Sequence, residues 1–176
     1  MRPGIAAQRQ VIIVTGSNRT GTSLLVELLA QKGFLPPAGA RVESEEYDVY
    51  ESLEFKKISR KWDWLAAKEF VDNLPGGKIV LKYPKSSSVI RKWIELIEDA
   101  KIIYVFRPRE EAVESQVRNW WRGRPLSFLA RWIYRYEWLR GYLAVSSLPV
   151  PVHFVTFEEL KYSKRIEFPS SWGWRD

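Results

Sequence analysis

Residues 11–25 read VIIVTGSNRTGTSLL and join a run of β-branched residues to a leucine-rich segment. The run Val11–Thr15 has no polar alternation, which is typical of a strand buried on both faces of a parallel sheet. Thr22–Gly33 has its leucines at helical spacing, and we expect Gly33 to end that helix. The residues between the two runs therefore form a turn that leads from a buried strand into a helix.

This turn has the spacing of a phosphate-binding loop. Four residues separate Gly16 from Gly21, as in the pattern G-x-x-x-x-G-K-[ST], but Thr22 stands where that pattern has Lys. Backbone N–H groups in such a loop converge on an anion at the start of the following helix. We expect Arg19 to supply the missing cation. The candidate phosphate-binding residues are Ser17, Asn18, Arg19, Thr20, Gly21, Thr22 and Ser23.

A simpler interpretation of the loop is a tight turn that needs its two glycines. In that case Thr22 or Ser23 is an ordinary polar cap of the helix that follows.

The rest of the chain alternates strands with helices. Further strands are predicted at Lys78–Lys82, Lys101–Phe106 and Pro151–Thr156. Helical patterns are found at Tyr50–Asp72 in two pieces, Ser86–Ile97, Glu110–Trp121, Pro125–Val145 and Phe157–Tyr162. The alternation predicts an α/β fold with a central, mostly parallel sheet of four to five strands. The length of 176 residues suits a single domain over residues 1–176, with residues 1–9 and 164–176 as flexible ends.

Composition excludes several kinds of site. The chain has no Cys, so it has no disulfide and no thiolate metal site, and its single His, His153, excludes a metal site with several His ligands. The formal charge of +7 favours anionic partners such as nucleotides, nucleic acids and sulfated sugars. No apolar run approaches the roughly 20 residues that span a bilayer, so we expect a cytoplasmic protein without a transmembrane segment.

A second candidate site follows the third predicted strand. Arg107 ends that strand in the stretch Tyr104–Arg109, YVFRPR, and ligands bind at the carboxyl ends of strands in open α/β sheets. The planar guanidinium suits a phosphate, and Ser115 in the next helix can add a hydroxyl. The alternative is that Arg107 pairs with Glu110, Glu111 or Glu114, and that Ser115 lies on the helix surface.

Together, the two motifs resemble those of sulfotransferases that use 3'-phosphoadenosine 5'-phosphosulfate (PAPS). Arg19–Ser23 is similar to the loop for the 5'-phosphosulfate, and Arg107 with Ser115 is similar to the site for the 3'-phosphate. The resemblance covers Val11–Tyr162, is specific in these two motifs, and is to a short bacterial or phage-type member. It implies a three-layer P-loop-like fold. It also implies metal-independent transfer of a sulfonate from PAPS to an acceptor hydroxyl or amine.

The resemblance also suggests catalytic residues. Arg19 stabilises the leaving phosphate, and Lys82 is similar to a Lys near the sulfonate in many members. Glu51, in an aromatic-Glu pair with Tyr50, is the first choice of base, and Glu54 is the second because three residues on puts it near the same helix face. The alternative is that Glu51 is a solvated helix carboxylate. His153 is expected to be a packed residue.

Two other functions remain open. A P-loop kinase or NTPase fits the glycine spacing, although Thr22 and strands without Asp or Glu do not favour a Mg²⁺ site. A nucleic-acid-binding module fits the charge and the Arg- and Trp-rich stretch Gln116–Tyr142, whose simpler interpretation is a helix with aromatics inward and Arg outward. The favoured partners are a nucleotide cosubstrate and a small-molecule or carbohydrate acceptor, with no metal and no nucleic acid.

Overall fold

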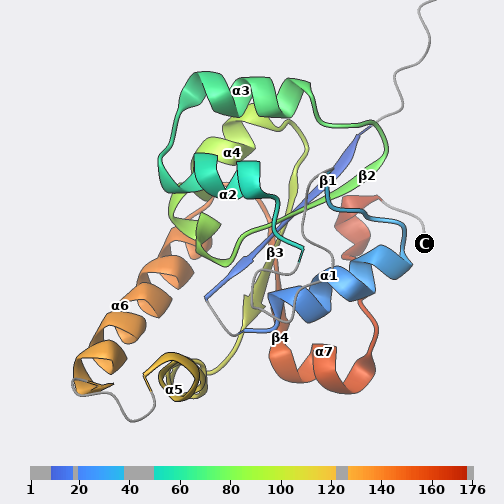
Figure 1. Cartoon of the computed structure of the whole chain (residues 1–176). Coiled ribbons are helices and arrows are strands. Elements are labelled where there is room, and N and C mark those ends of the chain that lie inside the picture. The colour runs from blue at the N-terminus through green and yellow to red at the C-terminus, as the bar shows by residue number, and fades with distance from the viewer. Residues whose placement is uncertain (1–8, 18–19, 38–49, 122–126, 174–176) are drawn as a thin grey trace, which may run out of the picture.

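The structure is a computed structural model that describes residues 9–17, 20–37, 50–121 and 127–173, apart from the side chain of Trp120. Strands and helices alternate along the chain (Figure 1). The strands are β1 (Gln10–Gly16), β2 (Lys78–Lys82), β3 (Lys101–Phe106) and β4 (Val152–Thr156). The helices are α1 (Thr22–Gln31), α2 (Leu53–Arg60), α3 (Trp64–Asp72), α4 (Ile90–Leu96), α5 (Arg109–Trp120), α6 (Ser127–Ser146) and α7 (Phe157–Ser163), with short 3₁₀ helices η1 (Pro84–Val89) and η2 (Ser170–Trp172).

All four strands are parallel, in the order β2-β1-β3-β4, which confirms the predicted α/β fold. The register places Val14 beside Lys82, and Gly16 beside Val105. The chain therefore leaves every strand at the same edge of the sheet. In open parallel sheets this carboxyl edge is where ligands bind.

Helices cover both faces of the sheet and give the molecule three layers. Helices α1 and α7 lie on one face, whereas α2, α3, α4 and α6 lie on the other (Figure 1). Ile12 and Val14 pack toward the first face, and Ile13 packs toward the second. Because both faces are buried, the strands are apolar throughout, as expected for a parallel sheet.

Local signals set the ends of several helices. Gly33 follows α1 with a left-handed backbone (φ 83°), as predicted. The Ser52 hydroxyl caps α2 by accepting from Phe55 N, and the Asp63 carboxylate caps α3 by accepting from Leu65 N and Ala66 N. These two caps divide the predicted stretch Tyr50–Asp72 into two helices. The predicted helix Ser86–Ile97 differs because its first part is the 3₁₀ helix η1.

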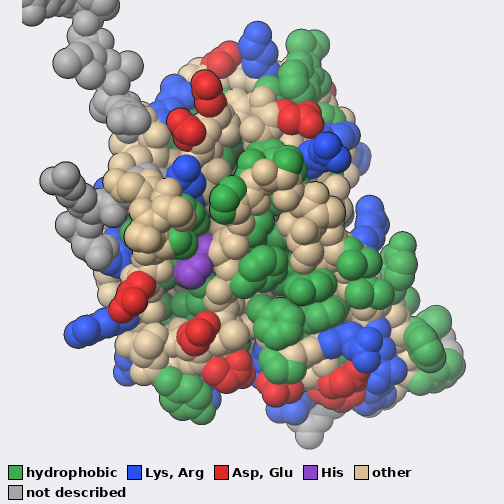
Figure 2. Space-filling model, turned by 180° about the vertical axis from the view of Figure 1, so that it is seen from behind, with side chains coloured by type: hydrophobic (Ala, Val, Ile, Leu, Met, Phe, Trp, Pro, Cys, Tyr) green, Lys and Arg blue, Asp and Glu red, His purple; other side chains and the backbone are tan. Residues whose placement is uncertain are grey.

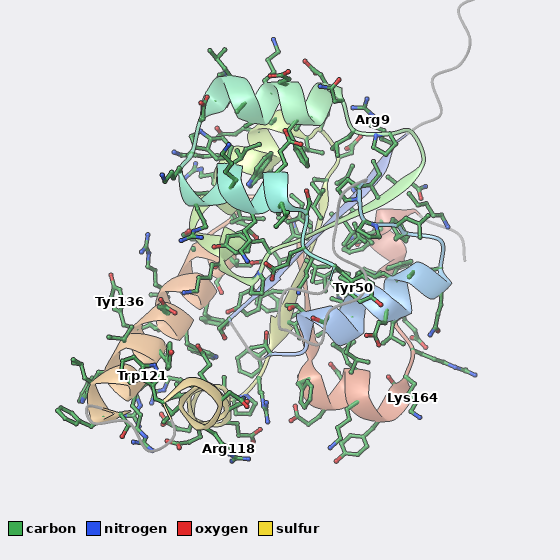
Figure 3. The ribbon with its side chains drawn as sticks, in the orientation of Figure 1. Arg9, Tyr50, Arg118, Trp121, Tyr136 and Lys164 are labelled. Atoms are coloured by element: carbon green, nitrogen blue, oxygen red, sulfur yellow. The ribbon has the colours of Figure 1, made fainter. Side chains whose placement is uncertain are left out.

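Helix α6 does not follow the expected arrangement of aromatics inward and Arg outward. Phe128, Trp132 and Tyr136 are all more than 60% exposed, and Tyr136 projects away from the sheet (Figure 3). Hydrophobic side chains can be seen among charged ones on the face shown in Figure 2. The buried residues of α6 are Ala130, Tyr134, Gly141 and Val145. No helix in the described part of the chain is long and apolar enough to cross a membrane.

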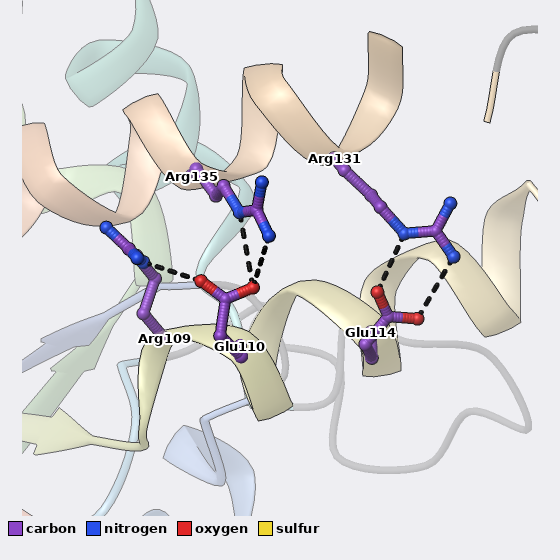
Figure 4. Close-up of polar contacts among 5 residues, drawn as sticks. All are labelled: Arg109, Glu110, Glu114, Arg131 and Arg135. Atoms are coloured by element: carbon purple, nitrogen blue, oxygen red, sulfur yellow. Dashed lines mark hydrogen bonds and ion pairs between the residues drawn. The ribbon is translucent and has the colours of Figure 1, made fainter. Parts of the chain in front are cut away.

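Ion pairs with α5 explain this orientation of α6 (Figure 4). Arg131 Nε donates to Glu114 Oε1 over 2.7 Å, and Arg135 Nη2 donates to Glu110 Oε2 over 2.6 Å. Hydrogen bonds from these arginines hold the pKa values of both carboxyls below their usual range. The arginines therefore turn toward α5, and Trp132, which lies between them in the sequence, faces solvent, whereas Tyr134 is buried.

Candidate functional site

The loop after β1 is close-packed around its two glycines. A Cβ on Gly16 would lie 2.7 Å from Thr20 Oγ1 and 2.8 Å from the Val105 carbonyl oxygen. Gly21 has φ 92°, and a Cβ there would lie 2.5 Å from Phe157 Cδ2. The Thr20 hydroxyl donates to the Ser17 carbonyl oxygen over 2.7 Å and holds the loop closed. The predicted loop residues Asn18 and Arg19 lie outside the described residues.

Among the described residues, no side chain caps the start of α1. Gly21 is the N-cap residue, and neither Thr22 nor Ser23 makes a capping hydrogen bond. The simpler interpretation of these residues as ordinary caps is therefore wrong. The first-turn N–H groups of a helix need a partner, and an anion satisfies them well.

A buried ion pair lies beside the first turn of α1. Lys82 is only 2% exposed; its Nζ lies 3.3 Å from Glu51 Oε1 and donates to Ser23 Oγ over 3.1 Å. Glu51 is 3% exposed, and its Oε2 lies 3.0 Å from Lys56 Nζ. The pairing of β2 with β1 brings Lys82 to this position at the carboxyl edge. The structure thus brings together three of the predicted residues, from three segments of the chain.

Glu51 reaches the site because it is not part of a helix. It precedes Ser52, the N-cap residue of α2, and follows Tyr50, whose left-handed backbone (φ 63°) is uncommon for a bulky residue (Figure 3). The alternative that Glu51 is a solvated helix carboxylate is therefore wrong. The expectation that Glu54 lies near Glu51 on the same helix face is also wrong, because Glu54 is exposed in the first turn of α2. Lys56 was not predicted, since its contact depends on this cap.

Arg107 lies where predicted, at the end of β3, but it already has neighbours. Its Nε donates to Glu111 Oε2 over 3.3 Å. The alternative in which Arg107 pairs with a glutamate of α5 is therefore confirmed for Glu111. Its carbonyl oxygen accepts from Trp138 Nε1 over 3.1 Å, which ties α6 to this edge. Ser115 is half-buried one turn after Glu111. Any phosphate bound by Arg107 and Ser115 therefore competes with Glu111.

The Phe157 ring contacts both the loop and Arg107. The sequence pattern did not identify this residue. Its ring contacts the position where a Gly21 Cβ would lie, and the Arg107 guanidinium carbon is 4.7 Å from the ring centroid. The only signal in the sequence is its place directly after the last strand. The Phe157 ring therefore contacts both predicted phosphate-binding positions, Gly21 in the loop and Arg107 after β3.

His153 lies within β4 and is packed, as expected. Its ring meets the buried ring of Trp172 edge-on at 5.9 Å, on the α1 face of the sheet. Burial lowers the pKa of His153, against a smaller opposite effect of Glu159. In the described part of the chain, no three His, Asp or Glu side chains gather closely enough to hold a metal ion.

We expect the stability of the protein to fall as the pH drops below the usual His pKa of about 6.5. Because the folded-state pKa of His153 is depressed, the unfolded chain binds more protons in this window. The stabilisation is complete above the unfolded pKa and is lost as the pH falls through the folded pKa. Urea unfolding at about pH 7.5 and about pH 5.5 should show this fall in wild type and a smaller one in His153→Phe. Equal falls in both proteins would contradict the prediction.

Comparisons with known proteins find solved structures with a similar fold. No protein-family model matches the chain, and no curated protein matches it. It is similar to the solved sulfotransferase domain from the curacin biosynthetic pathway, with a TM-score of 0.55 and 20% identity, covering 89% of this chain and 70% of that one. It is also similar to sulfotransferase STF9 from Mycobacterium avium, with a TM-score of 0.52 and 19% identity, covering 88% of this chain and 60% of that one. At this identity the likeness establishes a shared fold.

Proposed function

We propose that this chain, which has the fold of two sulfotransferases, transfers a sulfonate from PAPS to a hydroxyl or amine of an acceptor. One observation carries the proposal: the buried contact of Lys82 with Glu51 and Ser23 at the start of α1. It gives a cation and a carboxylate at the mouth of a phosphate-binding loop. The left-handed backbone of Tyr50, directly before Glu51, adds support because such strain gathers at functional sites.

The chain offers a fitting place for each end of the nucleotide. The start of α1 and the buried Ser17 hydroxyl suit the 5'-phosphate, because in the described part of the chain no side chain caps the helix and none bonds to this hydroxyl. Arg107 and Ser115 suit the 3'-phosphate, and Arg19 adds a further cation to the loop. The 3'-phosphate contact is what would separate this nucleotide from ATP.

The proposed transfer step uses Glu51 and Lys82, which already lie close together. Glu51 accepts the proton of the acceptor hydroxyl. The oxygen of that hydroxyl bonds to sulfur while the bond from sulfur to the phosphate oxygen breaks. The electron pair leaves with the phosphate, where Lys82, Arg19 and the first N–H groups of α1 stabilise the growing charge. Glu54 is a poor base by comparison, since it is exposed on α2.

The nucleic-acid alternative loses support from the ion pairs of α6. Arg131 and Arg135 are engaged by Glu114 and Glu110, so the helix does not present an unbroken row of cations. Backbone phosphates are bound chiefly by such rows.

We expect 3'-phosphoadenosine 5'-phosphate to bind without Mg²⁺, and more tightly than ATP. Arg107→Ala should weaken binding by about 1.5–3 kcal/mol, the contribution of a hydrogen bond to a charged group. Glu111→Gln should tighten it slightly, because a competing carboxylate is removed from Arg107. Calorimetric titration of both nucleotides, with and without Mg²⁺, measures these effects.

Arg118→Ala is the matched control, since Arg118 is an exposed arginine near the end of α5 (Figure 3), whereas Arg107 precedes the start of that helix. It should leave binding unchanged. A preference for ATP with Mg²⁺, or equal binding by Arg107→Ala and Arg118→Ala, would overturn the proposed nucleotide and favour a kinase or NTPase.

A further inference from the structure

A small cavity opens beside the phosphate-binding loop, on the side of α6. Its volume is about 100 Å³, and its walls come from the start of the loop, from η1 and from α6. The cavity shares Gly16 and Ser17 with the loop. Any group that enters it therefore lies next to whatever the loop binds.

The size of the cavity limits what it can hold. Pockets for whole drug-sized ligands measure about 300–1,000 Å³, whereas this cavity measures about 100 Å³. This cavity therefore suits one small polar group of a larger molecule. The remainder of that molecule stays outside, toward solvent.

One of the hydroxyl groups that line the cavity, that of Ser17, needs a partner. Ser17 is buried, and its hydroxyl has no hydrogen-bond partner among the residues that the structure describes. The Tyr104 hydroxyl, also buried and without a partner among the described residues, lies 3.7 Å from the place of a Gly141 Cβ, behind the lining residues. Native proteins rarely bury hydroxyls in this way, because each one forgoes the hydrogen bonds it makes in water. A polar group of a ligand would supply the missing bond to Ser17.

Gly141 keeps the cavity open within helix α6. A Cβ at this position would lie 3.0 Å from Ser87 Oγ and 3.7 Å from the Tyr104 hydroxyl. Glycine in a helix interior is unfavourable relative to alanine. Its presence here leaves Ser87, which is itself buried, in reach of the cavity.

The rim of the cavity carries an excess of positive charge. Lys85 Nζ lies 3.1 Å from Glu137 Oε1, so these two residues balance one another. Arg140 also lines the cavity, one turn further along α6, and takes part in none of the ion pairs among the described residues. Two cations and one carboxylate give the rim a net positive charge, which one bound anion would neutralise. An arginine fork suits a planar or tetrahedral oxyanion.

We propose that this cavity is the acceptor subsite, and that it selects acceptors which carry a carboxylate or sulfate next to hydroxyl groups, as in an acidic sugar. Arg140 and Lys85 at the rim bind the oxyanion, and Ser87 binds a neighbouring hydroxyl, while Ser17 stays with the 5'-phosphate. The assignment of this cavity to the acceptor rests on the proposed function, whereas its fit to an oxyanion rests on the lining residues alone.

Three probes with the same ring and the same aromatic group test it. These are 4-nitrophenyl β-glucuronide, 4-nitrophenyl β-glucoside 6-sulfate and the neutral 4-nitrophenyl β-glucoside. Their dissociation constants are measured by calorimetry on the full chain, first alone and then saturated with 3'-phosphoadenosine 5'-phosphate. We expect at least one acidic probe to bind about tenfold to a hundredfold more tightly than the neutral probe. The better of the two acidic probes identifies the oxyanion as carboxylate or sulfate.

Arg140→Ala should remove this preference, Arg140→Lys should keep part of it, and Arg118→Ala should keep all of it. Thermal unfolding of each variant verifies that it folds. If the nucleotide binds but all three probes bind equally well, the inference is overturned and the sulfotransferase proposal is untouched. If the nucleotide fails to bind but the acidic preference persists and depends on Arg140, the proposed function fails and the cavity remains an oxyanion site.

Discussion

Lys82→Met should lower the free energy of unfolding by about 3 kcal/mol, the lower end of the range for a broken buried ion pair. The substitution leaves the buried carboxylate of Glu51 with Lys56 as its remaining ammonium neighbour, 3.0 Å away. If the chain is a sulfotransferase, turnover should also fall by roughly a hundredfold or more, as for the loss of a group that stabilises charge in the transition state. Urea unfolding measures the first effect, and an assay with PAPS measures the second.

The chain provides a matched control for this effect. Lys85→Met also breaks a Lys–Glu pair, but side chains there are 48% and 38% exposed, so the cost should stay within about 1 kcal/mol. The double variant Lys82→Met/Glu51→Gln should recover most of the lost stability, because no buried charge is left without its partner. A cost for Lys82→Met no larger than that for Lys85→Met would contradict the burial argument.

Gly21→Ala should destabilise the protein by about 2–5 kcal/mol and abolish nucleotide binding. Two effects add up: a non-glycine residue at φ 92° is strained by about 1–2 kcal/mol, and overpacking costs about 1–3 kcal/mol more. The overpacking arises because the new Cβ would lie 2.5 Å from the Phe157 ring. Urea unfolding and calorimetric titration with 3'-phosphoadenosine 5'-phosphate report the two outcomes.

Gly77→Ala separates the two effects. Gly77 also has φ 92°, but a Cβ there meets nothing within 4 Å. It should therefore show the backbone strain alone and leave nucleotide binding as in wild type. The difference between the two variants is the cost of the contact with Phe157. Equal destabilisation by both substitutions would mean that the ring yields without cost.

The sheet could be predicted closely from the sequence because its strands are buried on both faces. Lys78–Lys82 and Lys101–Phe106 begin and end in the structure where the pattern places them. Such strands are apolar from end to end, and each stops where a polar or glycine-containing segment begins. The position of the loop follows directly, since it connects one of these strands to a helix.

The site was harder to predict, because it depends on where helices begin and how they turn. Glu51 enters the core because the cap at Ser52 leaves it outside α2, and helix ends are the least certain feature of a helical pattern. Helix α6 illustrates the second difficulty. Its aromatic and basic residues fit either orientation, and the carboxylates of α5 decide between them. A contact between distant segments of this kind leaves no periodic signal.

The place of Phe157 bears on the entropy of nucleotide binding. Its ring packs against Gly21 on one side and under Arg107 on the other, so the packed core determines how far apart the two phosphate-binding ends lie. A ligand that must draw loops together loses affinity to the ordering of those loops. Here Gly21 and Arg107 already contact one packed ring, so in the proposed complex the protein, rather than its ligand, sets the span that a nucleotide must match.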